Sequence, residues 1–282
     1  MLAARTAAEL ARVDAGFRFV DRGRYPFRRQ GVGIPTLAEV LRRYGDVPII
    51  VEMKVDTPAM AVRPRGSEAA GGQELGYQFT LEHRPGGEGE WQGVTIRLPL
   101  HGRYNVDNFL AAAATALALG VAPEELAAGA LDAAAASHRG VVRRLGSDVT
   151  VIDDCYNSNP EALSRALESA AELPASRRWA VLGDMLELGP DEKMFHAEAG
   201  REAAEMGFAP VAAVGGLAVA LADGAARAGV SSHAFAEASE AARWAASEVR
   251  PGDLVLVKGS RGVGLEVVIE ALEDACGSEE TT

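Results

Sequence analysis

The segment 153–160 carries more polar side chains than a helix start requires. It reads Asp-Asp-Cys-Tyr-Asn-Ser-Asn-Pro and lies between an apolar run and a helical pattern. Asn159 is suited to cap that helix, and Pro160 suits its first position. Ligands of open α/β sheets bind where strands end, so this segment is a candidate binding site, although a well-capped turn that binds nothing is the alternative. The candidate ligand-binding residues are Asp154, Tyr156, Asn157 and Asn159.

A second candidate site is the segment 258–262, which reads Lys-Gly-Ser-Arg-Gly after the apolar run 254–257. Glycine lets the backbone approach a ligand closely, while Lys258 and Arg261 supply positive charge for a phosphate or a carboxylate. The pattern indicates an anion-binding loop in which Ser260 lies between the two cations. A surface turn with solvated cations is the alternative interpretation.

Two further segments hold polar groups that could contact a ligand. Asn105 and Asn108 are three residues apart, so they can share one face of a helix's first turn. Their amides offer a donor and an acceptor, as a purine edge requires, although taken alone a surface helix cap is the favoured interpretation. Asp184, in a Gly-Asp-Met-Leu-Glu-Leu-Gly segment, could orient a substrate or lie solvated, and His196 on the next helix is expected to be a packing residue.

The elements around these segments alternate between strand and helix, which predicts a parallel sheet in an α/β domain over about 145–278. Upstream, a linker or long loop is expected at 61–75 and a β-hairpin over 77–100. Residues 105–136 are expected to be helical. The expected strands of the α/β domain are 149–153, 179–183, 210–214, 232–235 and 254–257, and its expected helices are 160–172, 191–206, 217–228, 238–249 and 264–276.

The composition restricts the classes of partner. The chain has 282 residues, a net charge of -12 and a pI of about 5.0, which argues against nucleic acid or an anionic membrane as the main partner. Its two cysteines are too few for a disulfide framework. No apolar run long enough to span a membrane and no secretory signal is apparent, so we expect a cytoplasmic protein without membrane insertion.

The order of the four segments is more specific than any one of them. Four motifs follow one another between residues 105 and 262: Asn-x-x-Asn, Asp-Asp-x-Tyr-Asn-x-Asn-Pro, Gly-Asp-Met-x-Glu-Leu-Gly and Val-Lys-Gly-Ser-Arg-Gly. Together with the sequence around them, they extend the pattern over about residues 64–278. This series resembles the C-terminal part of the Mur ligases, and it is most similar to those that add D-alanyl-D-alanine. The resemblance implies ATP and Mg²⁺ as cofactors, and UDP-MurNAc-peptide and D-alanyl-D-alanine as substrates, in the synthesis of peptidoglycan precursors.

The resemblance also implies roles for individual residues. Asn105 and Asn108 match the pair that contacts adenine, although Tyr104 stands where the family often has His. Arg139 and the turn 154–160 match nucleotide-facing elements of a Rossmann-like domain that closes over the site. The residues that it places toward the substrate are Asp184, Lys258, Ser260 and Arg261.

A phosphate-binding loop is absent from the sequence. Such a loop needs Gly-Lys followed by Ser or Thr, and none of Lys54, Lys193 and Lys258 has those neighbours. The family's Mg²⁺ ligands, catalytic lysine and UDP-binding domain lie upstream of the matched region. We therefore predict that these 282 residues alone are not a competent ligase. A missing N-terminal half supplied by another chain is one interpretation that stays open.

Residues 1–62 resemble a slice of a glycerophosphodiester phosphodiesterase, a TIM-barrel family. The resemblance rests on Gly-Ile-Pro-Thr-Leu-Ala-Glu-Val-Leu at 33–41 and Ile-Val-Glu-Met-Lys at 50–54, and it implies a metal-ligating role for Glu52. A piece of this size cannot close a barrel. The expected architecture is therefore a partial barrel-like piece (1–62), a remnant of the Mur ligase central domain (63–140) and a Rossmann-like C-terminal domain (141–282).

Three functions remain open at this point. The first is a peptide ligase half, as the Mur resemblance implies. The second is a metal-dependent diester hydrolase acting through Glu52. It is disfavoured, because the segment 1–62 lacks the partner ligands that such a metal site needs. The third is a module that binds nucleotide or dipeptide without catalysis.

Overall fold

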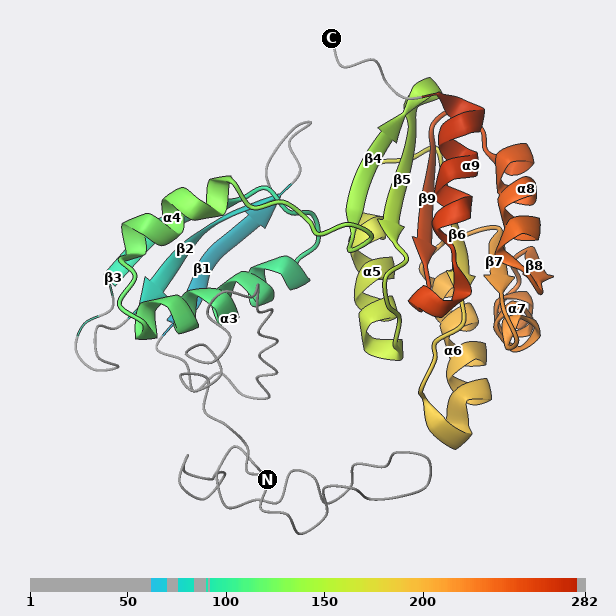
Figure 1. The fold of residues 1–282 in the computed structure, drawn as a ribbon, viewed down its shortest axis with the longest axis horizontal. Helices are drawn as coiled ribbons and strands as arrows, with labels where there is room; N and C mark the ends of the chain where they lie inside the picture. Colours follow the sequence, from blue (N-terminus) through green and yellow to red (C-terminus); the bar gives the residue numbers. More distant parts are fainter. Residues whose placement is uncertain (1–61, 70–75, 84–89, 91, 278–282) are drawn as a thin grey trace, which may run out of the picture. The chain divides into compact units, whose positions relative to one another are not determined.

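The computed structural model describes residues 62–69, 76–83, 90 and 92–277 (Figure 1). These residues form a three-stranded antiparallel sheet with two helices, followed by a six-stranded sheet with helices on both faces. The α/β class and the mostly parallel C-terminal sheet are confirmed. The phosphodiesterase-like interpretation and its Glu52 lie outside the described residues and stay predictions.

The smaller sheet consists of β1 (Val62–Ala69), β2 (Tyr77–His83) and β3 (Gln92–Leu98), in that order. Apolar side chains of β2 and β3 pack against α3 (Tyr104–Ala118) and α4 (Pro123–Leu131), and together they form one core. The period-two apolar pattern of a strand places these side chains on one face. The most buried of them are Phe79, Leu81, Ile96 and Leu98.

The linker expected at 61–75 is wrong over residues 62–69. These residues form β1, which pairs antiparallel with β2 from Val62 opposite His83, with a register shift between Arg65 and Glu68. Proline and glycine in this segment suggested a loop, yet an edge strand with an irregular ladder tolerates both. The region 105–136, which was expected to be helical, is divided into the two helices α3 and α4. Gly120 lies between them with a φ of 89°, which glycine adopts readily.

The larger sheet has the strand order β4-β5-β9-β6-β7-β8. Its five strands β5 to β9 run parallel, and β4 pairs antiparallel with β5. The expected strands and helices are confirmed to within two residues at each end. The strands are β4 (Val141–Leu145), β5 (Val149–Asp154), β6 (Arg177–Gly183), β7 (Val211–Val214), β8 (Ser232–Phe235) and β9 (Asp253–Lys258), and the helices are α5 (Pro160–Glu172), α6 (Glu192–Glu205), α7 (Ala218–Arg227), α8 (Ala238–Glu248) and α9 (Glu266–Cys276).

Helices cover both faces of this sheet (Figure 1). Along β9, Leu254 and Leu256 pack in the core with α5, α6 and α7, whereas Val255 and Val257 pack in the core with α8 and α9. A strand buried on both faces is apolar at every position, which explains the continuous apolar runs in the sequence.

Sequence analysis missed strand β4, so the expectation of a purely parallel sheet was incomplete. Residues 141–145 contain two adjacent arginines in five positions, which weakens any apolar pattern. The chain then reverses through a short 3-10 turn, where Ser147 and Asp148 take positive φ values of 62° and 57°. Gly-Ser-Asp is a turn-forming sequence, and it was the signal that could have located this antiparallel strand.

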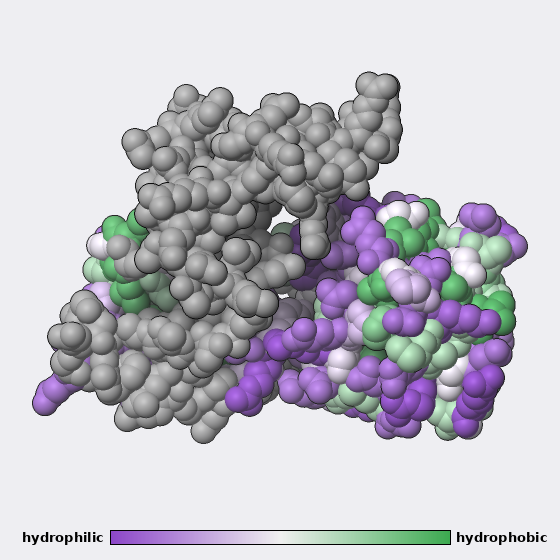
Figure 2. Space-filling view, turned by 90° about the horizontal axis from the view of Figure 1, so that it is seen from below, coloured by the Kyte–Doolittle hydropathy of each residue, from purple (hydrophilic) through white to green (hydrophobic). Residues whose placement is uncertain are grey.

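No helix among the described residues has the length and apolar character needed to cross a bilayer. Figure 2 shows hydrophilic and hydrophobic residues interspersed over the described part of one face. The exposed large aliphatic side chains of the described residues are spread over different elements: Leu119, Leu131, Leu186, Met194, Val219 and Val267.

We predict that Gly200→Ala strongly destabilises the larger domain. A Cβ at Gly200 on α6 would lie 1.9 Å from the Leu221 carbonyl oxygen on α7, so the two helices would have to separate. Overpacking of this kind costs about 1–3 kcal/mol or more. The matched control is Gly129→Ala on α4, where an added Cβ meets nothing within 4 Å. This substitution should raise the free energy of unfolding by about 0.4–1 kcal/mol. Equal melting temperatures of the two variants would contradict the close helix packing.

Candidate functional site

The carboxyl ends of β5 and β9 are joined by a buried ion pair. These strands are parallel neighbours in which Asp154 lies opposite Lys258. The Lys258 ammonium donates to Asp154 at 2.6 Å and to the Asn157 carbonyl oxygen at 2.9 Å. Its side chain is only 3% exposed, so the substrate contact expected for Lys258 stays a prediction, and the observed partners of its ammonium belong to the protein. The pair fixes the turn after β5 against the end of β9.

Burial raises the pKa of the Asp154 carboxyl, and the Lys258 ammonium offsets only part of that effect. The carboxylate is nevertheless the form that the ion pair requires. Removing either partner would leave a buried group without its counter-charge, which costs about 3–5 kcal/mol. The loop geometry therefore depends on both residues being present.

Three exposed side chains that the sequence singled out come together at this edge. Arg139 lies over the Tyr156 ring with its guanidinium carbon 4.0 Å from the ring centroid, and Arg261 lies 5.5 Å from the same centroid. Arg139 precedes β4, Tyr156 follows β5, and Arg261 follows β9. Cation–π contacts hold the two guanidinium groups against the Tyr156 ring, and all three side chains are exposed to solvent. We call this group the Arg–Tyr–Arg cluster.

Asp184 and Ser260 support the neighbouring loops. The Asp184 carboxylate accepts backbone hydrogen bonds from Gly216 at 2.7 Å and Leu217 at 3.1 Å. Ser260 donates its backbone N–H to the Asp184 carbonyl, and its hydroxyl accepts from the Leu186 N–H at 3.0 Å. Both residues hold the ends of β6, β7 and β9 together, so the substrate contact expected for them stays a prediction.

His196 has the packing role expected for it. It is fully buried, and its Nε2 accepts from the Met185 N–H at 2.8 Å while its Nδ1 lies 2.7 Å from the Glu192 carbonyl oxygen. These contacts define a neutral ring that donates from Nδ1. The residue fixes the turn that carries Asp184.

The asparagines divide between local roles. Asn159 caps α5 by accepting from the Ala162 N–H at 2.8 Å, as its position predicts, and Asn157 accepts from the next residue's N–H at 2.9 Å. Asn105 and Asn108 share a helix face as expected, because the Asn108 amide donates to the Asn105 side-chain oxygen at 3.3 Å. The Asn105 amide itself donates to the His101 carbonyl oxygen. Their contact with adenine stays a prediction.

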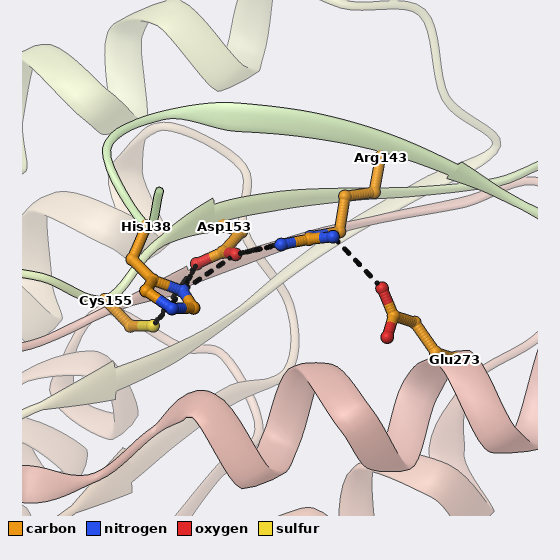
Figure 3. Close-up of polar contacts among 5 residues, drawn as sticks. All are labelled: His138, Arg143, Asp153, Cys155 and Glu273. Carbon is orange, nitrogen blue, oxygen red and sulfur yellow. Dashed lines mark hydrogen bonds and ion pairs between the residues drawn. The ribbon is translucent and has the colours of Figure 1, made fainter. Parts of the chain in front are cut away.

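A polar cluster that the sequence did not single out adjoins the Arg–Tyr–Arg cluster along the chain, because His138 precedes Arg139 and Cys155 precedes Tyr156. Figure 3 shows the five residues of this polar cluster. The buried Asp153 carboxylate lies 3.0 and 3.1 Å from His138 Nδ1 and accepts from the Arg143 guanidinium at 2.8 Å. The Cys155 thiol donates to the same carboxylate at 3.2 Å, and Glu273 of α9 pairs with Arg143 at 3.3 Å. Nothing in the sequence places His138 beside Cys155, so this cluster could not be found from the sequence.

The cluster shifts the pKa of two of its members in opposite directions. Burial alone would raise the pKa of Asp153, but hydrogen bonds from Arg143, Cys155 and His138 outweigh it and hold that pKa below its ordinary value. Burial and the adjacent Asp153 carboxylate raise the pKa of the Cys155 thiol, so the sulfur is protonated at neutral pH.

We expect Asp153→Asn to lower the stability at pH 7 and to flatten its dependence on acid pH. The pKa of Asp153 is lower in the folded chain than its ordinary 3.8, so its stabilising contribution is complete above about pH 4 and is lost as the pH falls further. The loss at pH 7 should be about 1–3 kcal/mol. Urea unfolding between pH 3 and 7 measures it, with the exposed Asp107→Asn as the control. Parallel pH profiles for wild type and Asp153→Asn would contradict the assignment.

Comparison with known proteins shows which family the larger domain is similar to. Residues 138–261 match the family described as "Mur ligase, glutamate ligase domain". A UDP-N-acetylmuramoyl-tripeptide–D-alanyl-D-alanine ligase of Mycobacterium tuberculosis is 39% identical over 211 residues, which covers 65% of this chain and 41% of the relative. The ligase of the same description from Escherichia coli is 32% identical over 201 residues, covering 71% of this chain and 42% of the relative.

The fold agrees with these sequence relatives. A MurF from Acinetobacter baumannii superposes with a TM-score of 0.67 at 30% identity, over 76% of this chain and 45% of that chain. The chain thus spans about two fifths of the length of the curated relatives it matches. The family match covers residues 138–261, and this part of the chain is similar in sequence and fold to the C-terminal domain of Mur ligases.

Proposed function

We propose that this chain supplies one half of a cytoplasmic ATP-dependent ligase that joins D-alanyl-D-alanine to UDP-MurNAc-tripeptide. In this proposal, its C-terminal domain closes over the bound nucleotide. The observation that carries the proposal is the Arg–Tyr–Arg cluster at the carboxyl edge of a parallel sheet, where open α/β folds bind their ligands. The names of the curated relatives support the choice of substrates.

The cluster has the chemistry that a nucleotide phosphate needs. Arg139 and Arg261 each present a planar guanidinium, which can form two parallel hydrogen bonds to phosphate oxygens. Tyr156 contributes an aromatic ring between them, and this ring limits the rotation of both cations. Pre-ordered cations lose less side-chain entropy on binding, so the anion is bound more tightly. ATP therefore fits the residues of this edge. A ligase of the same fold, MurF from Thermotoga maritima, has been crystallised in complex with ADP.

Magnesium does not fit the described residues in the same way. Mg²⁺ prefers an octahedron of oxygen ligands. Within 62–69, 76–83, 90 and 92–277, only His138, Asp153 and Cys155 form a group of three potential metal-binding side chains, and two of its ligand atoms are nitrogen and sulfur. We assign no phosphoryl-transfer step to this chain. In the proposal, the Mg²⁺ ligands and the phosphate loop belong to a second half, on the same or another polypeptide.

The residues of this chain would then bind and orient the reactants. Arg139 and Arg261 balance the negative charge of the nucleotide, while the Lys258–Asp154 pair holds the turn that carries Tyr156. Asp184 and Ser260 hold the ends of β6, β7 and β9 together, which fixes the adjacent loops where a substrate would bind. Closure of such a domain excludes water, which would otherwise hydrolyse an acyl phosphate.

A non-catalytic nucleotide-binding module is the second candidate, since the same cluster could hold a nucleotide without turnover. The two functions differ in one measurable property. A ligase half restores product formation when the phosphate-binding half is present, whereas a binding module does not.

We predict no ADP release by the purified chain given ATP, Mg²⁺, UDP-MurNAc-tripeptide and D-alanyl-D-alanine. Without phosphate-loop donors, phosphoryl transfer loses most of its electrostatic stabilisation. A chimera in which residues 64–282 replace the matching part of the M. tuberculosis relative should form the pentapeptide product. Substrate-dependent ADP release by the chain alone would refute the proposed division of labour. A folded chimera that binds ATP but forms no product would favour the binding module.

In that chimera, Arg261→Ala and Arg139→Ala should each lower kcat/KM by about 10–100-fold, the usual effect of losing a charge-assisted hydrogen bond. Tyr156→Ala should act similarly, whereas Tyr156→Phe keeps the ring and should change kcat/KM by less than about threefold. The matched control is Arg201→Ala on the exposed face of α6. If Arg201→Ala and Arg261→Ala had the same effect, the cluster would have no special role.

A further inference from the structure

The buried cluster that adjoins the Arg–Tyr–Arg cluster along the chain brings three different metal-ligating atoms together. His138 Nδ1 lies 3.1 Å from Asp153 Oδ1 and 3.6 Å from Cys155 Sγ, and the sulfur lies 3.2 Å from the same carboxylate oxygen. The imidazole, the carboxylate and the thiol thus converge on one point (Figure 3). We propose that His138, Asp153 and Cys155 form a three-ligand site for a divalent transition metal of the zinc class, with a fourth position open to water.

The spacing of the three atoms matches a tetrahedral zinc site. Zinc–ligand lengths of about 2.3 Å to sulfur and about 2.0 Å to nitrogen and oxygen predict separations of about 3.5 Å (N–S), 3.5 Å (S–O) and 3.3 Å (N–O). The observed separations are 3.6, 3.2 and 3.1 Å. Each ligand would therefore need to move by only a few tenths of an ångström to close on the metal.

The surroundings of the site balance its charge. Asp153 and Glu273 are two carboxylates with one guanidinium, Arg143, between them. A Cys155 thiolate would add a second net negative charge, which a divalent cation neutralises. Arg143 donates to Asp153 Oδ2, which leaves Oδ1 directed at His138 and Cys155. Hydrogen bonds of this kind to the outer oxygen orient a metal-binding carboxylate.

Proton movement on binding can be written without a redox step. The Cys155 S–H proton passes to solvent as the metal–sulfur bond forms. The His138 ring, which contacts Asp153 through Nδ1, exchanges its proton to Nε2 so that the Nδ1 lone pair faces the metal.

Of the three proposed ligands, only His138 is in contact with solvent. The His138 side chain is 25% exposed, while the side chain of Asp153 is fully buried and Cys155 is 0% exposed. A three-ligand site with solvent on the fourth side is the arrangement of an open zinc site. The nitrogen and sulfur ligands distinguish it from the Mg²⁺ that the ligase reaction requires.

The metal would also order the exposed Arg–Tyr–Arg cluster. His138 directly precedes Arg139 and Cys155 directly precedes Tyr156, and the Tyr156 N–H donates to the His138 carbonyl oxygen at 3.0 Å. An ion bound to His138 and Cys155 would therefore tie together the two backbone segments that carry the stacked Arg139 and Tyr156. This part of the inference rests on the proposed function, but metal binding itself does not.

Cobalt binding to the purified, chelator-treated chain tests the site. We expect one equivalent of Co²⁺ to give a sulfur-to-cobalt charge-transfer band and tetrahedral visible bands, which Zn²⁺ then removes. Cys155→Ser should abolish the charge-transfer band, whereas Cys276→Ser, which alters the other cysteine, should retain it. His138→Asn suits the positive φ of 61° at this position and should weaken Co²⁺ binding by about tenfold or more.

Circular dichroism of each variant shows whether it folds, and His138→Asn decides the matter if Cys155→Ser is unfolded. The inference is overturned if folded wild type gives no charge-transfer band with millimolar Co²⁺. It is equally overturned if the band survives in Cys155→Ser, or if it disappears in Cys276→Ser. None of these results bears on the ligase proposal, because none depends on turnover.

Discussion

The burial of Lys258 is the constraint on which the site depends. An ammonium that is 3% exposed needs a counter-charge, and Asp154 supplies it at 2.6 Å from the neighbouring strand. The same ammonium holds the Asn157 carbonyl oxygen, so the turn after β5 cannot move independently of β9. Tyr156 lies on that turn and Arg261 lies three residues after Lys258, which is why one buried pair positions two of the three exposed groups of the cluster.

The strand order explains why residues so distant in sequence meet. Strand β9 inserts between β5 and β6, which places the last strand of the chain beside the first parallel one. Sequence patterns predicted this α/β domain well, because strands buried on both faces and helices with one apolar face produce distinct periodicities. They missed β1 and β4, whose proline, glycine and paired arginines hide a strand pattern. Edge strands tolerate such residues, and tertiary pairing decides their structure.

The candidate residues that the sequence named differ in their surroundings, because some are exposed and others are buried. Tyr156 and Arg261 were selected from motifs and Arg139 from the family resemblance, and the structure brings the three together. Lys258, Asp184 and Ser260 were also selected from motifs, but their contacts in the structure are internal. A motif does not reveal which polar groups are already hydrogen-bonded within the fold. The His138–Asp153–Cys155 contacts could not be predicted, because they depend on the positive φ of His138 and on the pairing of β4 with β5.

The proposed function depends on nucleotide binding at the carboxyl edge formed by the ends of β5 and β9. Backbone chemical shifts of the purified chain, recorded while ADP is added, test it most directly. We expect saturable shifts concentrated at residues 138–140, 154–160 and 258–263, and we expect their loss in Arg261→Ala. Saturable shifts confined to other parts of the sheet, or none at millimolar ADP, would contradict it.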